Sequence, residues 1–171
     1  DRLLNVFEAA RDYGTEDRFL EYCSTSKITY PGAGVAAMAA SEANIAWTKK
    51  LMGVQAIGPD KVNQLRHVRY FKDLAGIEAH MEKHAAILKP KFDLVLSLLE
   101  ERLGGTGAGR WHSPRGGYFI SFDAMPGCAK RINALCREAG VVMTGAGATF
   151  PYGKDPQDSN LRIAPSLPPL E

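Results

Sequence analysis

A long amphipathic helix is the feature that most constrains how this chain can fold. Six apolar residues, spaced alternately four and three positions apart, form one seam along it: Met81, Ala85, Leu88, Phe92, Val95 and Leu99. This spacing predicts a helix from about residue 76 to residue 103, ended by Gly104. Pro90 falls inside that range and predicts a kink. Because the seam covers fewer than three heptads, we expect it to pack against a domain rather than in a coiled coil.

Shorter helical and strand patterns alternate on both sides of this helix. Before it, the patterns predict helices near the N-terminus (Leu3, Leu4, Phe7 and Ala10, with a stop at Gly14), at 41–52 and at 61–71, and strands at 18–23 and 35–40. After it, they predict strands near Trp111 and at 118–122, 141–143 and 161–164, and a helix at 129–139. The 35–40 segment is apolar on both faces, which is typical of a buried strand. This alternation without repeats indicates an α/β or α+β fold, divided into residues 1–73 and 74–171.

Composition excludes several classes of protein. The chain has 171 residues, of which 45% are hydrophobic and 23% charged, so it is not disordered or fibrous. A net charge of +2 gives no sign of a nucleic-acid partner, and no apolar run is long enough for a membrane span. Three scattered cysteines predict neither a disulfide framework nor a zinc site, and therefore a reducing, cytoplasmic location. The chain starts at Asp1 within a helical pattern and stops at Glu171 without a closing element, so we expect a segment of a longer protein.

Two patterns resemble ligand-binding motifs but have simpler interpretations. The glycine-rich residues 105–109 resemble a dinucleotide-binding loop, yet they follow a helix rather than a strand, so a turn is expected. His80 and His84 have the spacing of metal ligands on a helix, but no third ligand accompanies them. We therefore expect a solvated helix face and no metal site.

A more informative pattern lies where the strand at 18–23 ends. Ser24, Thr25 and Ser26 precede Lys27, which opens a loop rich in proline and glycine. Hydroxyl and backbone N–H groups at such a turn can hold a phosphate. A lysine there that is partly withdrawn from water can lose its proton more easily and act as an amine that traps a carbonyl group. The alternative is an ordinary solvated lysine.

Arg162 is the second candidate. It stands between apolar residues in the strand predicted at 161–164. An arginine that is at least half-buried needs an anionic partner. That partner is either a bound ligand or a carboxylate of the protein in a structural ion pair.

Several segments together resemble a known family, the fold-type I pyridoxal-phosphate aminotransferases. STSKITYPGAGV (residues 24–35) resembles the segment that carries the cofactor lysine, PRGGYF (114–119) a small-domain motif, and NLRIAPS (160–166) the segment that carries the carboxylate-binding arginine. IGPDKVNQLRH (57–67) and FPYGKDP (150–156) resemble the MocR-like bacterial aspartate aminotransferase branch. The resemblance covers essentially the whole chain. It implies the C-terminal part of such an enzyme, comprising the end of the large-domain sheet and an α+β small domain.

The resemblance also implies roles for individual residues. Lys27 would form a Schiff base with pyridoxal 5'-phosphate and move the proton of the substrate, while Ser24 and, more weakly, Ser26 would bind the phosphate. Arg162 would bind the substrate α-carboxylate, with Tyr118 and the neighbouring Phe119 close to the substrate. The implied reaction transfers an amino group, with aspartate as the expected donor, to a 2-oxo acid such as 2-oxoglutarate. The implied assembly is a homodimer.

One departure and two alternatives accompany this expectation. Many relatives carry a phosphate-binding arginine seven or eight residues after the lysine, where this chain has Gly34 and Val35. Phosphate binding must therefore use other groups, such as the backbone N–H groups of residues 31–34. The donor could instead be an aromatic or 2-aminoadipate-type amino acid. A non-catalytic alternative is an aminotransferase-like effector domain of a transcription regulator.

Overall fold

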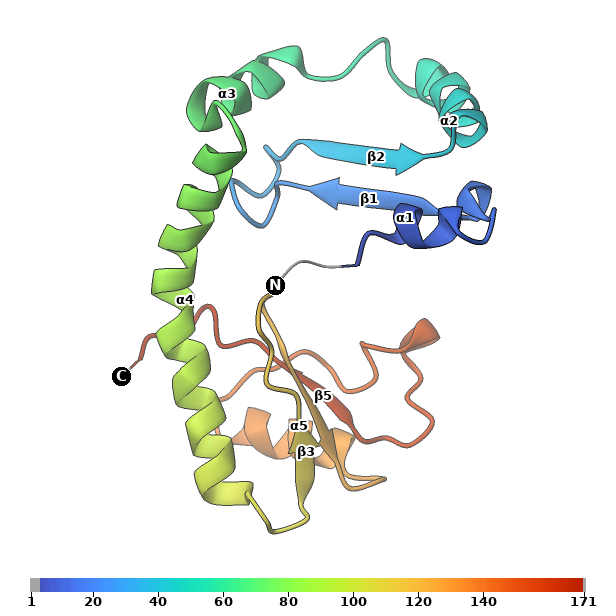
Figure 1. The fold of residues 1–171 in the computed structure, drawn as a ribbon. Helices are drawn as coiled ribbons and strands as arrows, with labels where there is room; N and C mark the ends of the chain where they lie inside the picture. Colours follow the sequence, from blue (N-terminus) through green and yellow to red (C-terminus); the bar gives the residue numbers. More distant parts are fainter. Residues whose placement is uncertain (1–3, 171) are drawn as a thin grey trace. The chain divides into compact units, whose positions relative to one another are not determined.

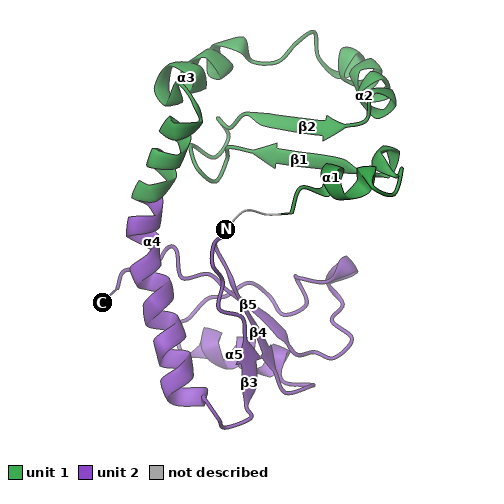
Figure 2. Cartoon of the chain, viewed as in Figure 1, with its two compact units in different colours: residues 1–83 green, residues 84–171 purple. Residues whose placement is uncertain are grey.

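The computed structural model describes residues 4–170, which form two compact units. Unit 1 comprises residues up to Lys83 and unit 2 begins at His84 (Figure 2). The division falls inside the long helix rather than at residue 73, where the sequence pattern put the boundary. Leu3 of the predicted first helix lies outside the described residues. Helices and strands are mixed in both units, which confirms the expected fold class.

Unit 1 is built around a two-stranded antiparallel ladder (Figure 1). Its elements are α1 (Val6–Arg11), the short helix η1 (Glu16–Arg18), β1 (Leu20–Ser24), β2 (Ala36–Ala40), α2 (Glu42–Gln55), α3 (Lys61–Phe71) and the start of α4 (Leu74–Leu103). Leu20 pairs with Ala40 and Ser24 with Ala36, so residues 25–35 form the connection at one end of the ladder. This connection carries the candidate lysine.

Side-chain caps explain where two helices of unit 1 begin. The Asp60 carboxylate accepts a hydrogen bond from the Asn63 N–H at 2.9 Å and starts α3 where the sequence predicts it. Ser41 does the same for α2 through the Asn44 N–H at 3.4 Å. Helix α2 ends later than the predicted residue 52: it continues through Gly53 to Gln55, because a helix tolerates a single glycine at a modest cost in propensity.

Strand β2 is not buried as predicted. Its five residues are exposed or half-buried. The apolar pattern is typical of an inner strand, but pairing with β1 covers one edge of β2 and not its faces, which only packed elements above and below the ladder would bury. Among the described residues of unit 1, the buried apolar side chains are those of Ala10 and Phe71.

Unit 2 contains the larger core. It comprises the rest of α4, β3 (Gly109–Trp111), β4 (Ile120–Ala124), α5 (Ala129–Glu138), the short helix η2 (Pro151–Gly153) and β5 (Asn160–Ile163). The three strands form an antiparallel sheet in the order β3-β4-β5. Its core cluster consists of four buried residues, Phe122, Ala124, Ala129 and Leu161. Leu99 and Leu103 of α4 pack against this cluster, as the seam predicts.

Helix α4 and the strands of unit 2 differ in part from the sequence prediction. Helix α4 runs through Pro90 as one element of 30 residues. The strand predicted at 118–122 begins two residues later, where Ile120 pairs with Ile163, and the strand predicted at 141–143 is absent because nothing pairs with that segment.

Cys23, Cys128 and Cys136 are free thiols. Within residues 4–170 no helix has the length and apolar character needed to cross a bilayer.

Candidate functional site

A compact turn presents Lys27 directly after β1. The Ile28 and Thr29 N–H groups donate to the Thr25 carbonyl oxygen at 3.0 and 2.8 Å, and the Thr25 N–H donates to the Val35 carbonyl oxygen at 2.9 Å. These bonds close the turn on both sides of Lys27, which is itself exposed. The lysine therefore lies on a backbone that is fixed locally.

Two hydroxyl groups lie together beside this lysine. Ser24 Oγ is 2.7 Å from Ser26 Oγ and accepts the Ser26 N–H at 3.1 Å. The structure thus brings together the hydroxyls of Ser24 and Ser26 at the end of β1, and Lys27 follows them directly in the chain. Paired hydroxyls and a nearby amine form a donor set suited to an anion such as a phosphate.

Gly34 explains how the loop can return so closely to this pair. A Cβ at position 34 would lie 2.5 Å from Ser26 Oγ and 3.0 Å from the Ser26 nitrogen. Only a residue without a side chain fits there without displacing Ser26. Gly34, which stands where many relatives carry an arginine, therefore lets the loop backbone pass close to the Ser26 hydroxyl. We call this close approach of Gly34 to Ser26 the cradle.

Arg162 lies in β5 of unit 2, opposite Ser121 of β4. Its Nη2 donates to Thr144 Oγ1 at 3.1 Å, and its guanidinium carbon lies 4.3 Å from the centre of the Phe119 ring. Its Nε is buried and has no hydrogen-bond partner. Among residues 4–170, no ion pair with a carboxylate involves Arg162, so the structural ion pair that the sequence left open is not seen.

The other sequence-predicted residue, Tyr118, is half-buried just before β4. Its neighbour Phe119 forms the stacking surface for Arg162. Thr144 was not predicted, because nothing in the sequence pairs a residue of an irregular segment with a strand residue 18 positions away. The Lys27 group belongs to unit 1 and the Arg162 group to unit 2.

The two alternative ligand motifs lie in the connection after α4 and on α4 itself. The glycine-rich segment at 105–109 connects α4 to β3, as expected of a turn. Within the described part of the chain, no three metal-ligating side chains gather. His80 is already engaged, since its Nε2 lies 2.8 Å from the Ile28 carbonyl oxygen and its Nδ1 lies 3.4 Å from the Tyr70 hydroxyl.

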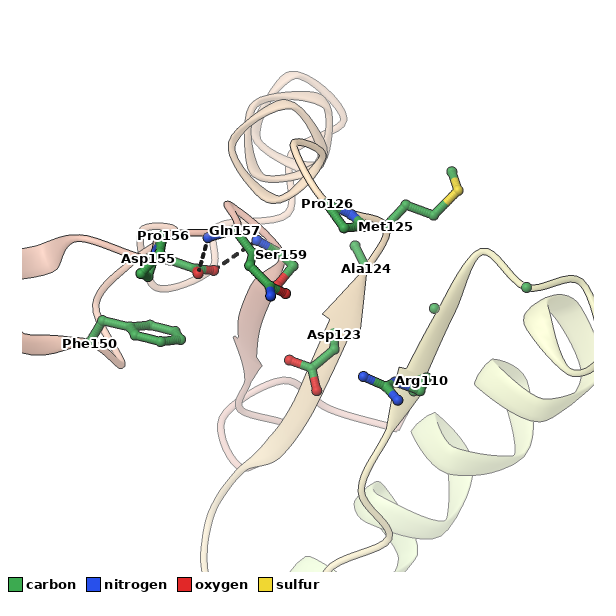
Figure 3. A pocket seen from close by; sticks show the side chains of 12 residues that line it. Arg110, Asp123, Ala124, Met125, Pro126, Phe150, Asp155, Pro156, Gln157 and Ser159 are labelled. Atoms are coloured by element: carbon green, nitrogen blue, oxygen red, sulfur yellow. Dashed lines mark hydrogen bonds between the residues drawn. The ribbon is translucent and has the colours of Figure 1, made fainter.

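An open pocket of about 740 Å³ lies elsewhere in unit 2 (Figure 3). Asp155 stands on its wall and accepts the N–H groups of Gln157 and Ser159 at 2.9 and 2.7 Å (Figure 3), and that of Asn160 at 2.8 Å. These bonds, that from Asn160 above all, hold the pKa of the Asp155 carboxyl below its usual value. The backbone thus saturates this carboxylate, and Lys27 and Arg162 are not among the residues that line the pocket. We interpret Asp155 as structural.

Comparisons with known proteins show what the whole chain is similar to. A family model described as aspartate amino-transferase matches residues 1–171. An aspartate aminotransferase of Corynebacterium glutamicum is 51% identical over 169 residues, covering 99% of this chain and 38% of its own length. A protein of Mycolicibacterium smegmatis, provisionally named an aminotransferase, is 50% identical over 167 residues, covering 98% and 39%. The crystal structure of an aspartate transaminase from Corynebacterium glutamicum aligns with a TM-score of 0.93 and 47% identity, over 99% of this chain and 40% of that one. The chain thus spans about two fifths of the length of these relatives.

Proposed function

The chain belongs to the aspartate amino-transferase family, and from this premise we propose that it is the C-terminal part of a pyridoxal-phosphate-dependent aminotransferase. The reaction moves the amino group of an amino acid, with aspartate as the preferred donor, to a 2-oxo acid such as 2-oxoglutarate. The donor leaves as its own 2-oxo acid and the acceptor as an amino acid. The observation that carries the proposal is the turn at the end of β1, in which the Ser24 and Ser26 hydroxyls lie 2.7 Å apart and Lys27 follows directly in the chain.

The residues of this turn fit pyridoxal phosphate. The Ser24 and Ser26 hydroxyls, 2.7 Å apart, offer hydrogen bonds to a phosphate, and Gly34 lets the loop pass close to Ser26 without a side chain that would displace its hydroxyl. Lys27 follows Ser26 directly and offers the amine that can hold the cofactor covalently. When bound, the cofactor supplies an electron sink that makes the Cα proton of the amino acid labile.

Lys27 has two tasks in this proposal. Its Nζ first holds the cofactor in place; once the amino group of the substrate has displaced it, the freed amine takes the proton from the substrate Cα as a general base and delivers it to C4′ of the cofactor as a general acid. Both tasks require the amine to keep one position relative to the phosphate. The hydrogen bonds from Ile28 and Thr29 to the Thr25 carbonyl oxygen support this, because they fix the backbone around Lys27.

Arg162 binds the substrate α-carboxylate in this proposal. A guanidinium can donate two parallel hydrogen bonds to a carboxylate, and the buried Nε of Arg162 still lacks an acceptor. Thr144 Oγ1 takes one hydrogen of Nη2 and the Phe119 ring covers one face of the guanidinium, so the group is held in place while Nε stays without an acceptor. Tyr118 is proposed to lie close to the substrate on the basis of its motif. We also propose a homodimer; the cytoplasmic location stays a prediction.

The test uses the full-length protein with pyridoxal phosphate. We expect borohydride to fix the cofactor on Lys27, identified by mass spectrometry of the peptide, and aspartate with 2-oxoglutarate to yield oxaloacetate. Lys27→Ala abolishes both, whereas Lys50→Ala, which removes an exposed lysine of α2, changes neither.

Three results would overturn parts of the proposal. Fixation of the cofactor in Lys27→Ala at another residue would remove Lys27 from its role. Conversion of an aromatic or 2-aminoadipate-type donor without conversion of aspartate would change the substrate class. Binding of the cofactor with no transfer from any of these donors would favour the effector-domain alternative.

A further inference from the structure

A hydrogen-bonded histidine supports the lysine turn from α3. His67 Nε2 lies 3.0 Å from Thr25 Oγ1 and 3.4 Å from Thr29 Oγ1, and His67 Nδ1 lies 2.9 Å from the Asn63 carbonyl oxygen. His67 is half-buried and lies 42 positions from Thr25 in the sequence. No pattern in the sequence predicts this contact.

The partners of His67 assign its protons. A carbonyl oxygen can only accept, so His67 Nδ1 carries the hydrogen and donates to Asn63. In the neutral ring Nε2 is then an acceptor, and the Thr25 hydroxyl donates to it. Thr25 Oγ1 in turn accepts the Val35 N–H at 2.8 Å. A continuous chain of donors therefore runs from Val35 through Thr25 and His67 to α3.

The same helix face contacts the other side of the loop. Asn63, one turn before His67, donates through Nδ2 to the Ala33 carbonyl oxygen at 2.7 Å. Thus α3 contacts the turn that follows β1 through His67 and the segment that leads into β2 through Asn63. Lys27 lies between these two contacts along the chain.

Aromatic packing holds His67 in place. The buried Phe71 ring lies 6.0 Å from the His67 ring and 5.3 Å from the His80 ring, measured between centroids. Tyr70 packs edge-on against both Phe71 and His80. His80 Nε2 donates to the carbonyl oxygen of Ile28, the residue after Lys27. These four residues form one support beneath the turn.

We propose that His67 is a positioning residue for Lys27, resting on the proposed function above. In its neutral state with the proton on Nδ1, it fixes the side chain of Thr25, and Thr25 closes the loop by accepting the Val35 N–H. Because Thr25 stands between Ser24 and Ser26 and two residues before Lys27, fixing it aligns the two hydroxyls with the amine. His67 itself touches neither cofactor nor substrate in this proposal.

The test compares His67→Leu, which removes the acceptor, with His67→Gln, whose side-chain oxygen can still accept from Thr25. Thr25→Val and Thr25→Ser form the matching pair at the other end of the bond. In full-length protein without cofactor, we expect His67→Leu and Thr25→Val each to speed amide hydrogen exchange of residues 24–35 about tenfold, the loss expected for one hydrogen bond. His67→Gln and Thr25→Ser restore most of the protection.

With cofactor, borohydride fixation on Lys27 slows about tenfold in His67→Leu, and kcat falls by a similar factor while KM for the amino acid changes less than about twofold. Val68→Ala, an exposed neighbour on α3, is the control and changes none of these quantities. If amide exchange of residues 24–35 and borohydride fixation on Lys27 in His67→Leu equalled those of Val68→Ala, the proposal would be overturned. If His67→Leu fails to fold, the two Thr25 variants decide. If wild type fixes no cofactor at Lys27, the proposed function fails, while the exchange comparison still tests the support of the turn.

Discussion

Among single residues, Arg162 has an incomplete set of hydrogen bonds in the described part of the chain. Its Nε is buried without an acceptor, although an unpaired buried donor is costly. The Phe119 ring at 4.3 Å compensates part of the charge through a cation–π contact. Thr144 takes up one Nη2 hydrogen. A carboxylate from outside the chain would complete this environment.

This environment predicts the effect of Arg162→Ala. In full-length protein we expect kcat/KM for the amino donor to fall by about 10²-fold or more, because a charge-assisted pair with the substrate carboxylate is lost. The cofactor should still be fixed on Lys27. Arg110→Ala removes an exposed arginine of the same sheet and serves as the control. An unchanged kcat/KM in Arg162→Ala would show that Arg162 is structural.

Gly34 is the second residue whose environment allows a sharp prediction. The methyl group of Gly34→Ala would enter the space of Ser26 Oγ, so we expect the variant to lose about 1–3 kcal/mol of stability as the turn shifts. Its affinity for pyridoxal phosphate, followed by absorbance titration, should fall as well.

The control for this variant is Gly53→Ala. Position 53 is a helix interior with open space around the added methyl group, so the substitution should be neutral or stabilise by up to about 1 kcal/mol. Equal urea midpoints for Gly34→Ala and wild type would contradict the cradle around Ser26.

At the scale of elements, Asp155 shapes the turn that leads into β5 and hence to Arg162. Its carboxylate accepts the backbone N–H groups of Ser159 and Asn160 at 2.7 and 2.8 Å. Because these bonds lower its folded-state pKa below 3.8, ionised Asp155 stabilises the fold above that pH. This contribution is lost as the pH falls through the depressed pKa.

Unfolding by urea between pH 3 and pH 7 checks this assignment. We expect Asp155→Asn to be less stable than wild type at pH 7 and the difference to shrink towards acid pH. Asp93→Asn breaks an exposed pair with Lys89 on α4 and should change stability little at any pH. A stability difference for Asp155→Asn that stays constant with pH would mean that the charge of Asp155 does not matter.

The elements that the sequence predicted well are those with local signals. Helix α3 begins and ends where expected, because Asp60 caps it and its residues follow one helical period. Strand β4 starts later than its aromatic pattern implies, since pairing with β5 and not β-propensity decides where a ladder begins. The strand predicted at 141–143 is wrong for the same reason, because no strand pairs with this segment.

In the candidate site, too, residues with a local sequence signal could be predicted and long-range contacts could not. Ser24, Ser26 and Lys27 could be found because they are close together in the sequence. The contacts that orient them and Arg162 could not: His67 reaches Thr25 across 42 positions and Thr144 reaches Arg162 across 18. Such pairs depend on the fold, and no periodicity or spacing encodes them.

Across the molecule, the two units differ in how many buried apolar residues they contain. Unit 2 holds the cluster of Phe122, Ala124, Ala129 and Leu161, packed under α4 and α5. Trp111 stacks on Phe122 with the ring centres 6.1 Å apart. Unit 1 exposes many large apolar side chains, among them Val54, Ile57 and Val62. Stability from apolar burial must therefore be concentrated in unit 2.

This difference predicts that residues 84–171 fold alone and that residues 4–83 do not. Excised residues 84–171 keep the half of α4 that carries Leu99 and Leu103, so the core cluster stays covered. We expect them to show a cooperative thermal transition and near-ultraviolet circular dichroism from Trp111, and residues 4–83 to show no cooperative transition. Leu161→Ala, which empties a buried position, should lower the stability of the excised unit by about 2–5 kcal/mol. A non-cooperative transition for residues 84–171 would mean that the cluster is not sufficient and that its stability depends on the rest of the protein.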